Sequence, residues 1–278
     1  MLPIIDARPV ETIKLPFSKK TISLKPYNSS QEKIILQTLT DKNDKANWLV
    51  NIKKIIKENL IDKDFDISSL NTIDFMYITI KLRSMSKSQN FDYSYKCPGK
   101  KKVIDPVGKE VEIDCLKLIS SSDNLMDIIK IKNCETQKVI CEMNDSLSFE
   151  LTVPGLDYFE FLTILDDKQE NILDNVDEQS EEHEMIILKQ NLELFSNQIS
   201  YCIKKVIVKE AGKSKIYHEF TPEELREKII DNITLDDLHK LYDHRNKLVS
   251  MSVKVEKKCP DCGFVFEKEA KNFFEFIA

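Results

Sequence analysis

Residues 71–99 have the sequence NTIDFMYITIKLRSMSKSQNFDYSYKCPG, and the rest of the chain is organised around the pattern in this stretch. Its first part predicts a helix, because four apolar residues recur at i, i+3, i+4 and i+7 and would form one face toward the core. These residues are Ile73, Met76, Tyr77 and Ile80. Thr72 is the expected N-cap, and Asp74 in the first turn complements the positive end of the helix dipole. We expect the serines between 84 and 88 to end the helix, and Arg83 to play a structural part there.

A strand is expected next, because Phe91, Tyr93 and Tyr95 alternate with polar residues and lead directly to Cys97. The same order returns near the end of the chain. There a helical pattern is followed by two serines, an alternating strand and the triplet Lys258-Cys259-Pro260. Two copies are too few for a tandem repeat array, so the similarity is interpreted either as two related substructures or as a coincidence.

Composition is typical of a globular protein: 41% of the 278 residues are hydrophobic and 32% are charged, enough for one large domain or two closely packed ones. The net charge of −6 argues against a general phosphate-binding surface, and the run Lys100-Lys101-Lys102 is interpreted as a solvated loop. We find neither the basic start of a signal peptide nor an apolar run long enough to cross a membrane. Seven cysteines without an export signal predict reduced thiols in a cytosol.

The first half of the chain is expected to open with a β-hairpin and three helices. Leu15–Phe17 and Thr21–Leu24 would form the hairpin, in a proline-rich segment suited to a sheet edge. A capping box at Ser29 and Glu32 opens one helix, and Trp48 lies at the start of the next. After Cys97 we expect a turn-rich loop and then four strands, at 111–115, 126–131, 138–143 and 147–153. The expected core residues of this β region are Ile140, Phe149, Leu151 and Val153.

The second half is expected to be mainly helical. Helices at 156–165 and 181–200 are joined by an acidic segment, 166–182, which we interpret as a solvated loop. A hairpin follows around Gly212, and Thr221 then opens a helix with a proline at its first position. The remaining expected features are a helix from Thr234, a strand pair at 252–258 and 264–269, and a docked tail with Phe273, Phe274 and Phe276.

These elements predict an α+β fold: an N-terminal hairpin with helices, an antiparallel β region, and a helical C-terminal half closed by a Cys-x-x-Cys hairpin. The expected domains are residues 1–97, 98–154 and 155–278, or a single compact domain.

The strongest chemical signal is the sequence Cys259-Pro260-Asp261-Cys262-Gly263, at the hinge of the last strand pair. Two thiolates at this spacing form half of a zinc ribbon or knuckle, and Cys97 is the best third ligand because its strand and turn repeat the pattern. Cys115 is the best fourth ligand, and His244 is a substitute for it. The prediction is one structural zinc ion; the alternatives are metal-free thiols on a hairpin tip and a redox pair. The redox pair is disfavoured because a strand follows, where a thioredoxin-like motif opens a helix.

The other candidates for chemistry are weaker. Cys134, Cys141 and Cys202 lie in apolar patterns and are expected to be buried structural cysteines. The histidines at 183, 218, 239 and 244 do not follow zinc-enzyme spacing, and we find no phosphate-binding loop, dinucleotide fingerprint, nucleophile elbow or kinase motif. We therefore expect no enzymatic activity, no catalytic residues and no cofactor other than zinc.

Several short motifs, taken in order, resemble those of T-even-type bacteriophage baseplate proteins. The N-terminal signature is Leu15-Pro16-Phe17-Ser18, then Ile22 to Pro26, then Glu32-Lys33. Asp74 to Ile78 and Leu82 to Ser86 stand where members of that family carry a characteristic helix motif. Tyr95-Lys96-Cys97 stands where a strand of the family ends in a cysteine. The resemblance covers about residues 12–160, and the C-terminal Cys-x-x-Cys with its Phe-rich end is similar as well. The departure is the missing second cysteine directly after Cys97.

The resemblance implies a non-enzymatic protein of the central hub of a contractile-tail phage baseplate, either a hub subunit or a factor needed to assemble the hub. It implies partners among the other baseplate and tail proteins, contacts between copies of this chain, and a location in the virion tail, with the host cytoplasm during assembly. The alternative is a zinc-ribbon protein that binds nucleic acid, in the manner of a transcription-associated factor. The acidic balance and the absence of a basic stripe with interleaved aromatics count against nucleic acid as a partner, and no membrane partner is expected.

Overall fold

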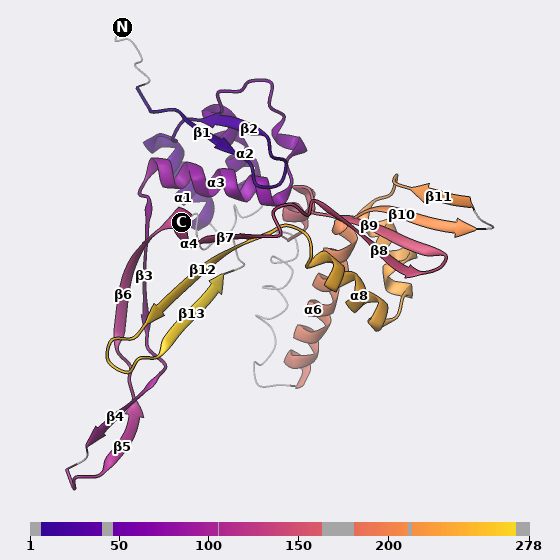
Figure 1. Cartoon of the computed structure of the whole chain (residues 1–278). Helices are drawn as coiled ribbons and strands as arrows, with labels where there is room; N and C mark the ends of the chain where they lie inside the picture. Colours follow the sequence, from indigo (N-terminus) through magenta and orange to yellow (C-terminus); the bar gives the residue numbers. More distant parts are fainter. Residues whose placement is uncertain (1–6, 41–46, 105, 163–180, 211–212, 271–278) are drawn as a thin grey trace.

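The structure, a computed structural model, describes residues 7–40, 47–104, 106–162, 181–210 and 213–270. Helices and antiparallel sheets both occur, which confirms the α+β class. Figure 1 shows a helical N-terminal unit, a sheet with its own helices, and two long β-hairpins beside them, one of which extends into a projecting arm. None of the helices in the described ranges is long and apolar enough to cross a membrane.

The N-terminal unit is a two-stranded hairpin packed on three helices. Its elements are β1 (Glu11–Lys14), β2 (Thr21–Leu24), α1 (Ser29–Thr40), α2 (Trp48–Asn59) and α3 (Thr72–Ser86). The first strand begins earlier than expected, since Leu15–Phe17 belongs to the connection. The cap of α1 also moves by one residue: Asn28 Oδ1 accepts from the amides of Ser30 and Gln31, and Gln31 Oε1 accepts from Asn28 N.

Helix α3 lies at the centre of this unit and is buried on nearly all sides. Phe75, Ile78 and Leu82 are at most 2% exposed, whereas Met76 and Tyr77 are half-buried, so the expected face is only partly correct. Ile73 and Ile80 are buried as expected. The aromatic rings of Trp48 and Phe159 pack on Phe75, with centroid distances of 6.3 and 5.8 Å.

The N-terminal end of α3 differs from the prediction, and its C-terminal end agrees with it. Asn71 is the N-cap instead of Thr72: its side chain accepts from Asp74 N, while Thr72 N donates to Pro154 O. The helix ends at Ser86, within the expected serines, and Ser86 Oγ donates to Leu82 O inside the helix and accepts from Tyr27 N outside it. A hydroxyl that bonds back to its own helix is compatible with helical backbone.

Asp74 joins α3 to the β1–β2 hairpin. It is fully buried, and its two carboxylate oxygens accept from Phe17 N at 2.8 Å and Ser18 N at 2.9 Å. Asn71 Nδ2 donates to the same carboxylate at 3.2 Å. A single side chain therefore fixes the hairpin turn on the helix.

A long two-stranded ribbon leaves the N-terminal unit after α3. The chain runs outward through β3 (Asn90–Lys96) and β4 (Lys100–Ile104) and returns through β5 (Glu110–Asp114) and β6 (Leu118–Asn124). Strand β4 pairs with β5, and β3 pairs with β6. The lysine run at 100–102 is a strand and the interpretation as a loop was wrong. The expected strand 126–131 begins as a helical turn, α4 (Leu125–Ile128), and continues as β7 (Ile129–Lys132).

The sheet unit has the strand order β11-β10-β9-β8. Its elements are β8 (Lys138–Asn144), β9 (Leu147–Thr152), β10 (Ile203–Glu210), β11 (Lys213–Tyr217), α6 (Glu181–Cys202), α7 (Pro222–Lys228) and α8 (Leu235–Arg245). The capping box of Thr221 and Glu224 and the cap at Thr234 are confirmed. Phe149, Leu151 and Val153 are buried as expected, but Ile140 is 53% exposed because Cys141 occupies the inward position.

The last hairpin joins the two units. Strand β12 (Ser250–Lys258) pairs with β7 on one side and with β13 (Val265–Ala270) on the other, and Val253 and Val255 enter the core of the N-terminal unit. Short 3-10 turns lie at Ile67–Ser69 and Ile230–Asn232. The buried apolar side chains form two clusters, and each cluster contains residues from before and after positions 97 and 154. The domain boundaries expected at these positions stay a prediction. Residues 166–180 of the acidic segment expected at 166–182, and the Phe-rich tail, lie outside the described residues, while 181–182 open α6.

Candidate metal centre

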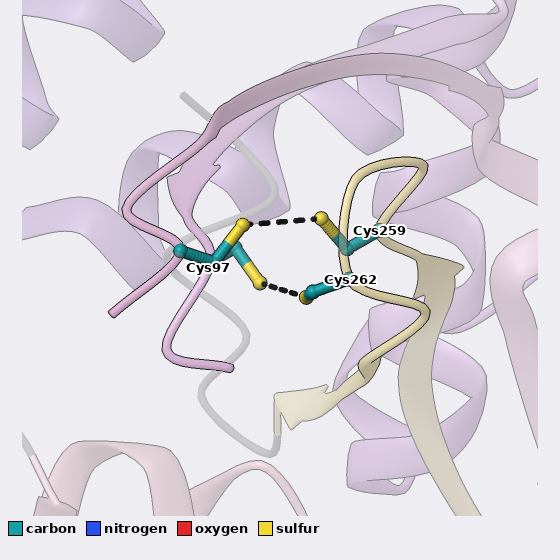
Figure 2. A group of neighbouring side chains, drawn as sticks. Cys97, Cys259 and Cys262 are labelled. Atoms are coloured by element: carbon teal, nitrogen blue, oxygen red, sulfur yellow. Dashed lines mark hydrogen bonds between the residues drawn. The ribbon is translucent and has the colours of Figure 1, made fainter. Parts of the chain in front are cut away.

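Four cysteines from distant parts of the chain converge at one point. Their Sγ atoms all lie within 4.8 Å of one another, and the four residues are Cys97, Cys115, Cys259 and Cys262. We call this group the thiol cluster. The Cys97 and Cys262 sulfurs are 3.5 Å apart and those of Cys115 and Cys259 3.7 Å apart (Figure 2). Cys97, Cys115 and Cys259 are buried and Cys262 is half-buried, so the cluster is closed to solvent on most sides.

The ribbon supplies two of the thiols, one from each strand. Cys97 follows β3 and Cys115 follows β5, and the ladder continues between them: Cys97 N donates to Lys117 O at 2.9 Å and Cys115 N to Gly99 O at 2.8 Å. The second ligand that a Cys-x-x-Cys would place after Cys97 therefore comes from the opposite strand.

The β12–β13 hairpin supplies the other two thiols through its tip. Cys259 N donates to Phe264 O at 2.8 Å and Gly263 N to Cys259 O at 3.0 Å, which closes a tight turn. Gly263 has a φ of 74°, a left-handed conformation that suits glycine. The turn brings Cys262 back to the side of Cys259, as expected for two ligands of one centre.

Backbone amides point at the sulfurs. Gly99 N donates to Cys97 Sγ at 3.4 Å, the amide of Lys117 donates to Cys115, and those of Cys262 and Asp261 donate to Cys259. Burial raises the pKa of the Cys97 thiol to about 12. Burial also acts to raise the pKa of Cys259, but the amide donors outweigh it and lower this pKa to about 7. A hydrogen bond to sulfur favours the charged thiolate over the thiol.

Gly99 lets the two halves of the thiol cluster approach. A Cβ at this position would lie 2.9 Å from Cys262 Sγ and 2.6 Å from Phe264 Cβ, which is closer than atoms can pack. The glycine is therefore required by the close contact between the ribbon and the turn of the last hairpin.

An ion pair and an aromatic stack hold the two hairpins together beside the thiol cluster. Lys257 Nζ lies 2.7 Å from Asp123 Oδ1, and Tyr93 donates its hydroxyl to Asp123 Oδ2 at 2.7 Å. Burial raises the pKa of Asp123, but the hydrogen bonds and the charge of Lys257 outweigh it and keep the value below 3.8. The rings of Tyr95 and Phe266 stack with centroids 3.7 Å apart. No local pattern predicts these contacts, because they join residues far apart in the chain.

The remaining candidates lie elsewhere. His244 is on α8, its Nδ1 is 2.8 Å from Lys240 O, and it is not part of the thiol cluster. Cys141 and Cys202 are buried in the core of the sheet unit as expected, but Cys134 is exposed, so its predicted burial was wrong. Arg83 is buried, and its Nε and Nη1 atoms make no hydrogen bond within the described part of the chain. Its structural role stays a prediction.

Four converging sulfurs allow few kinds of chemistry: they can bind a tetrahedral metal ion, form disulfides, or remain thiols. In regular tetrahedral coordination with Zn–S bonds of about 2.3 Å, neighbouring sulfurs lie about 3.8 Å apart. A disulfide would need a separation of about 2.05 Å. The distances of 3.5 and 3.7 Å in the thiol cluster lie close to the first value. The fold and the site define an α+β protein whose distant hairpins meet at a closed tetrathiol centre.

The comparison with known families identifies the class further. The chain belongs to the T4 bacteriophage base plate protein family, whose model matches residues 8–278. No curated protein and no solved structure matches the chain. Membership of this family supports a structural role in the phage baseplate, a location in the virion tail and contacts with other baseplate and tail proteins.

Proposed function

We propose that this baseplate protein acts in the central hub, as a hub subunit or as a factor that assembles the hub, and that it works through protein–protein interfaces without enzymatic activity. The observation that carries the proposal is the arm, which we define as the hairpin of β4 and β5, residues 100–114. The arm projects away from both cores (Figure 1). An isolated two-stranded hairpin is marginally stable in water, so such an element is best explained by a partner that covers it.

The two faces of the arm differ in chemistry. Cross-strand partners share a face, and the register pairs Val103 with Val111 and Lys101 with Ile113. This face is apolar apart from the lysine, and Val111 and Ile113 are 37% and 44% exposed. The opposite face is charged apart from the exposed Ile104, and on it the side chains of Lys102 and Glu110 form a diagonal 3.0 Å ion pair.

Other apolar residues near the arm are exposed as well, at its tip and at its root. Val107 near the tip is 81% exposed, and Leu116 and Leu118 at the root are 64% and 60% exposed. Contiguous exposed apolar side chains with a charged rim mark interaction sites. The partner that fits is an apolar surface of another baseplate protein, and the acidic balance of the whole chain, −6, disfavours nucleic acid.

The test separates the two faces of one strand. The variant Val111→Lys/Ile113→Lys should fold as the parent does but lose co-sedimentation with tail proteins and fail to complement a phage that lacks this gene. The matched control, Glu110→Lys/Glu112→Lys, adds lysines to the other face and should keep both functions. Normal assembly by the first variant would refute the role of the arm.

A second experiment tests the location. Cross-linking of assembling tails followed by mass spectrometry should join this chain to components of the central hub. Cross-links only to the outer baseplate would refute the hub assignment, and mass spectrometry of purified virions distinguishes a resident subunit from an assembly factor.

A further inference from the structure

We propose that the thiol cluster binds one Zn²⁺ ion as a closed tetrathiolate, and that this ion fixes the root of the arm on the turn of the last hairpin. The metal site is independent of the hub assignment, and it is tested separately from it. The inference goes beyond family membership, which concerns the baseplate and does not name a metal.

The arrangement of the sulfurs is the first argument. The thiol cluster forms a small core of its own, in which Cys97, Cys115 and Cys259 are at most 7% exposed. Sulfur separations of 3.5 Å for Cys97–Cys262 and 3.7 Å for Cys115–Cys259 fit a tetrahedron around a single ion and are much longer than a disulfide bond. Four protein ligands complete the coordination of zinc, which is the arrangement of a structural site and not of a catalytic one.

The amide groups at the sulfurs are the second argument. At Cys97 a backbone N–H donates to the sulfur from two residues further along: Gly99 N lies 3.4 Å from Cys97 Sγ. Such donors stabilise a thiolate, and outer-shell hydrogen bonds of this kind orient metal ligands. Binding would release the thiol protons to solvent and leave four thiolates on the ion.

The charges near the site are the third argument. Zinc with four thiolates carries a net charge of −2, and lysines adjoin the cysteines in the sequence at positions 96, 100, 117 and 258. Lys117 also lies 3.6 Å from Asp261, so it bridges the two halves of the thiol cluster. Thiolate ligands select zinc or iron. We choose zinc because it has no redox chemistry and would serve only to link the ribbon rigidly to the last hairpin.

The position of the thiol cluster gives the ion its role. Cys97 and Cys115 flank the arm on its two strands, while Cys259 and Cys262 belong to a hairpin anchored in the N-terminal unit through Val253 and Val255. Without the ion, the root of the arm is held by the ladder of the ribbon and by the contacts of Asp123 and Tyr95. With it, the arm is tied to an element that reaches the core.

The experiment uses the full chain, purified under reducing conditions. Elemental analysis should find about one zinc ion per chain, and replacement by Co²⁺ should give the intense visible bands of tetrahedral thiolate coordination. Cys262→Ser should lose most of the bound metal. The matched control is Cys134→Ser, which removes an exposed cysteine outside the thiol cluster and should keep the full metal content.

Hydrogen exchange then tests the role of the ion. A chelator added to the parent protein should speed exchange in the ribbon, the arm and the turn at 259–263, while α3 and β9 stay protected. If Cys262→Ser fails to fold, the chelated parent still gives this result. Reduced protein that holds no metal and binds no Co²⁺, bound iron in place of zinc, or disulfides between the four cysteines would each overturn the proposal. If removal of the metal left the hydrogen-exchange rates of the arm unchanged, the proposed role of the ion would be overturned.

Discussion

Replacing Asp74 with alanine should destabilise the N-terminal unit, because it removes the acceptor that holds the turn of the first hairpin. The amides of Phe17 and Ser18 would lose their partner in a partly buried place, at a cost of roughly 1–2 kcal/mol each. The loss of an acidic side chain in the first turn of α3 adds about 0.5 kcal/mol. The expected total is about 3 kcal/mol, a large share of the stability of an average domain.

The control is a solvent-exposed carboxylate that accepts the same kind of hydrogen bond from a backbone amide. Asp62 Oδ2 accepts from Ser23 N at 2.7 Å on the other strand of the hairpin, but Asp62 is exposed. Asp62→Ala should therefore cost only about 0.5–1 kcal/mol. Asp74 accepts from two backbone amides of the hairpin and Asp62 from one, so a difference larger than the loss of one extra bond reports the effect of burial.

Urea unfolding followed by fluorescence measures the difference. Trp48 is the only tryptophan of the chain and is 3% exposed in the core of the N-terminal unit, so its emission reports on this part of the molecule. Asp74→Ala should move the midpoint strongly to lower urea, and Asp62→Ala only slightly, with the slope unchanged. Equal shifts for the two variants would refute the claim that the buried carboxylate fixes the hairpin on α3.

Three other variants test separate parts of the structure. Gly99→Ala should loosen the thiol cluster and speed metal release, whereas Gly108→Ala at the open tip of the arm should leave metal content unchanged; equal release rates would contradict the close contact. Phe75→Ala should cost about 4 kcal/mol in thermal or urea unfolding, because it empties a fully buried aromatic site. Burial acts to raise the pKa of Asp123, but the hydrogen bonds from Lys257 and Tyr93 and the charge of Lys257 hold it below its usual value. The ion pair with Lys257 therefore stabilises the fold at neutral pH, and this stabilisation is lost as the pH falls through the lowered folded pKa. Asp123→Asn should flatten the fall in unfolding midpoint between about pH 5 and pH 2, and an unchanged acid limb would contradict the pairing.

The sequence predicted elements well where local chemistry decides them. The capping box at Thr221 and the alternation from Phe91 to Tyr95 depend on neighbouring residues, and both are confirmed. The cap of α3 was wrong by one residue because Asn71 and Thr72 are both good caps, and a distant carbonyl, that of Pro154, decides between them. The apolar face of α3 was only partly correct because the helix is enclosed, and periodicity identifies a face only when one side is solvated.

The candidate site shows the same division. The turn chemistry of Cys259–Gly263 was visible in the sequence, and the structure brings all four expected cysteines together. The strand β6 was missed because its centre is Ser-Ser-Ser-Asp, which has no apolar alternation. That strand sets the register of the ribbon and so places Cys115 opposite Gly99, two residues beyond Cys97. Pairing between distant strands is a tertiary property, which no local pattern records.

The distance along the chain between the two halves of the thiol cluster affects how the protein is made. Cys115 and Cys259 are 144 residues apart, so a ribosome working at about 5–20 residues per second exposes the first half roughly 7 to 30 s before the second exists. During that time β7 also lacks β12, its only strand partner among the described residues, and its open edge can pair with other chains. Nascent copies synthesised side by side on one messenger are therefore exposed to mispairing until the last hairpin emerges, and a chaperone that shields the ribbon would raise the yield of folded protein.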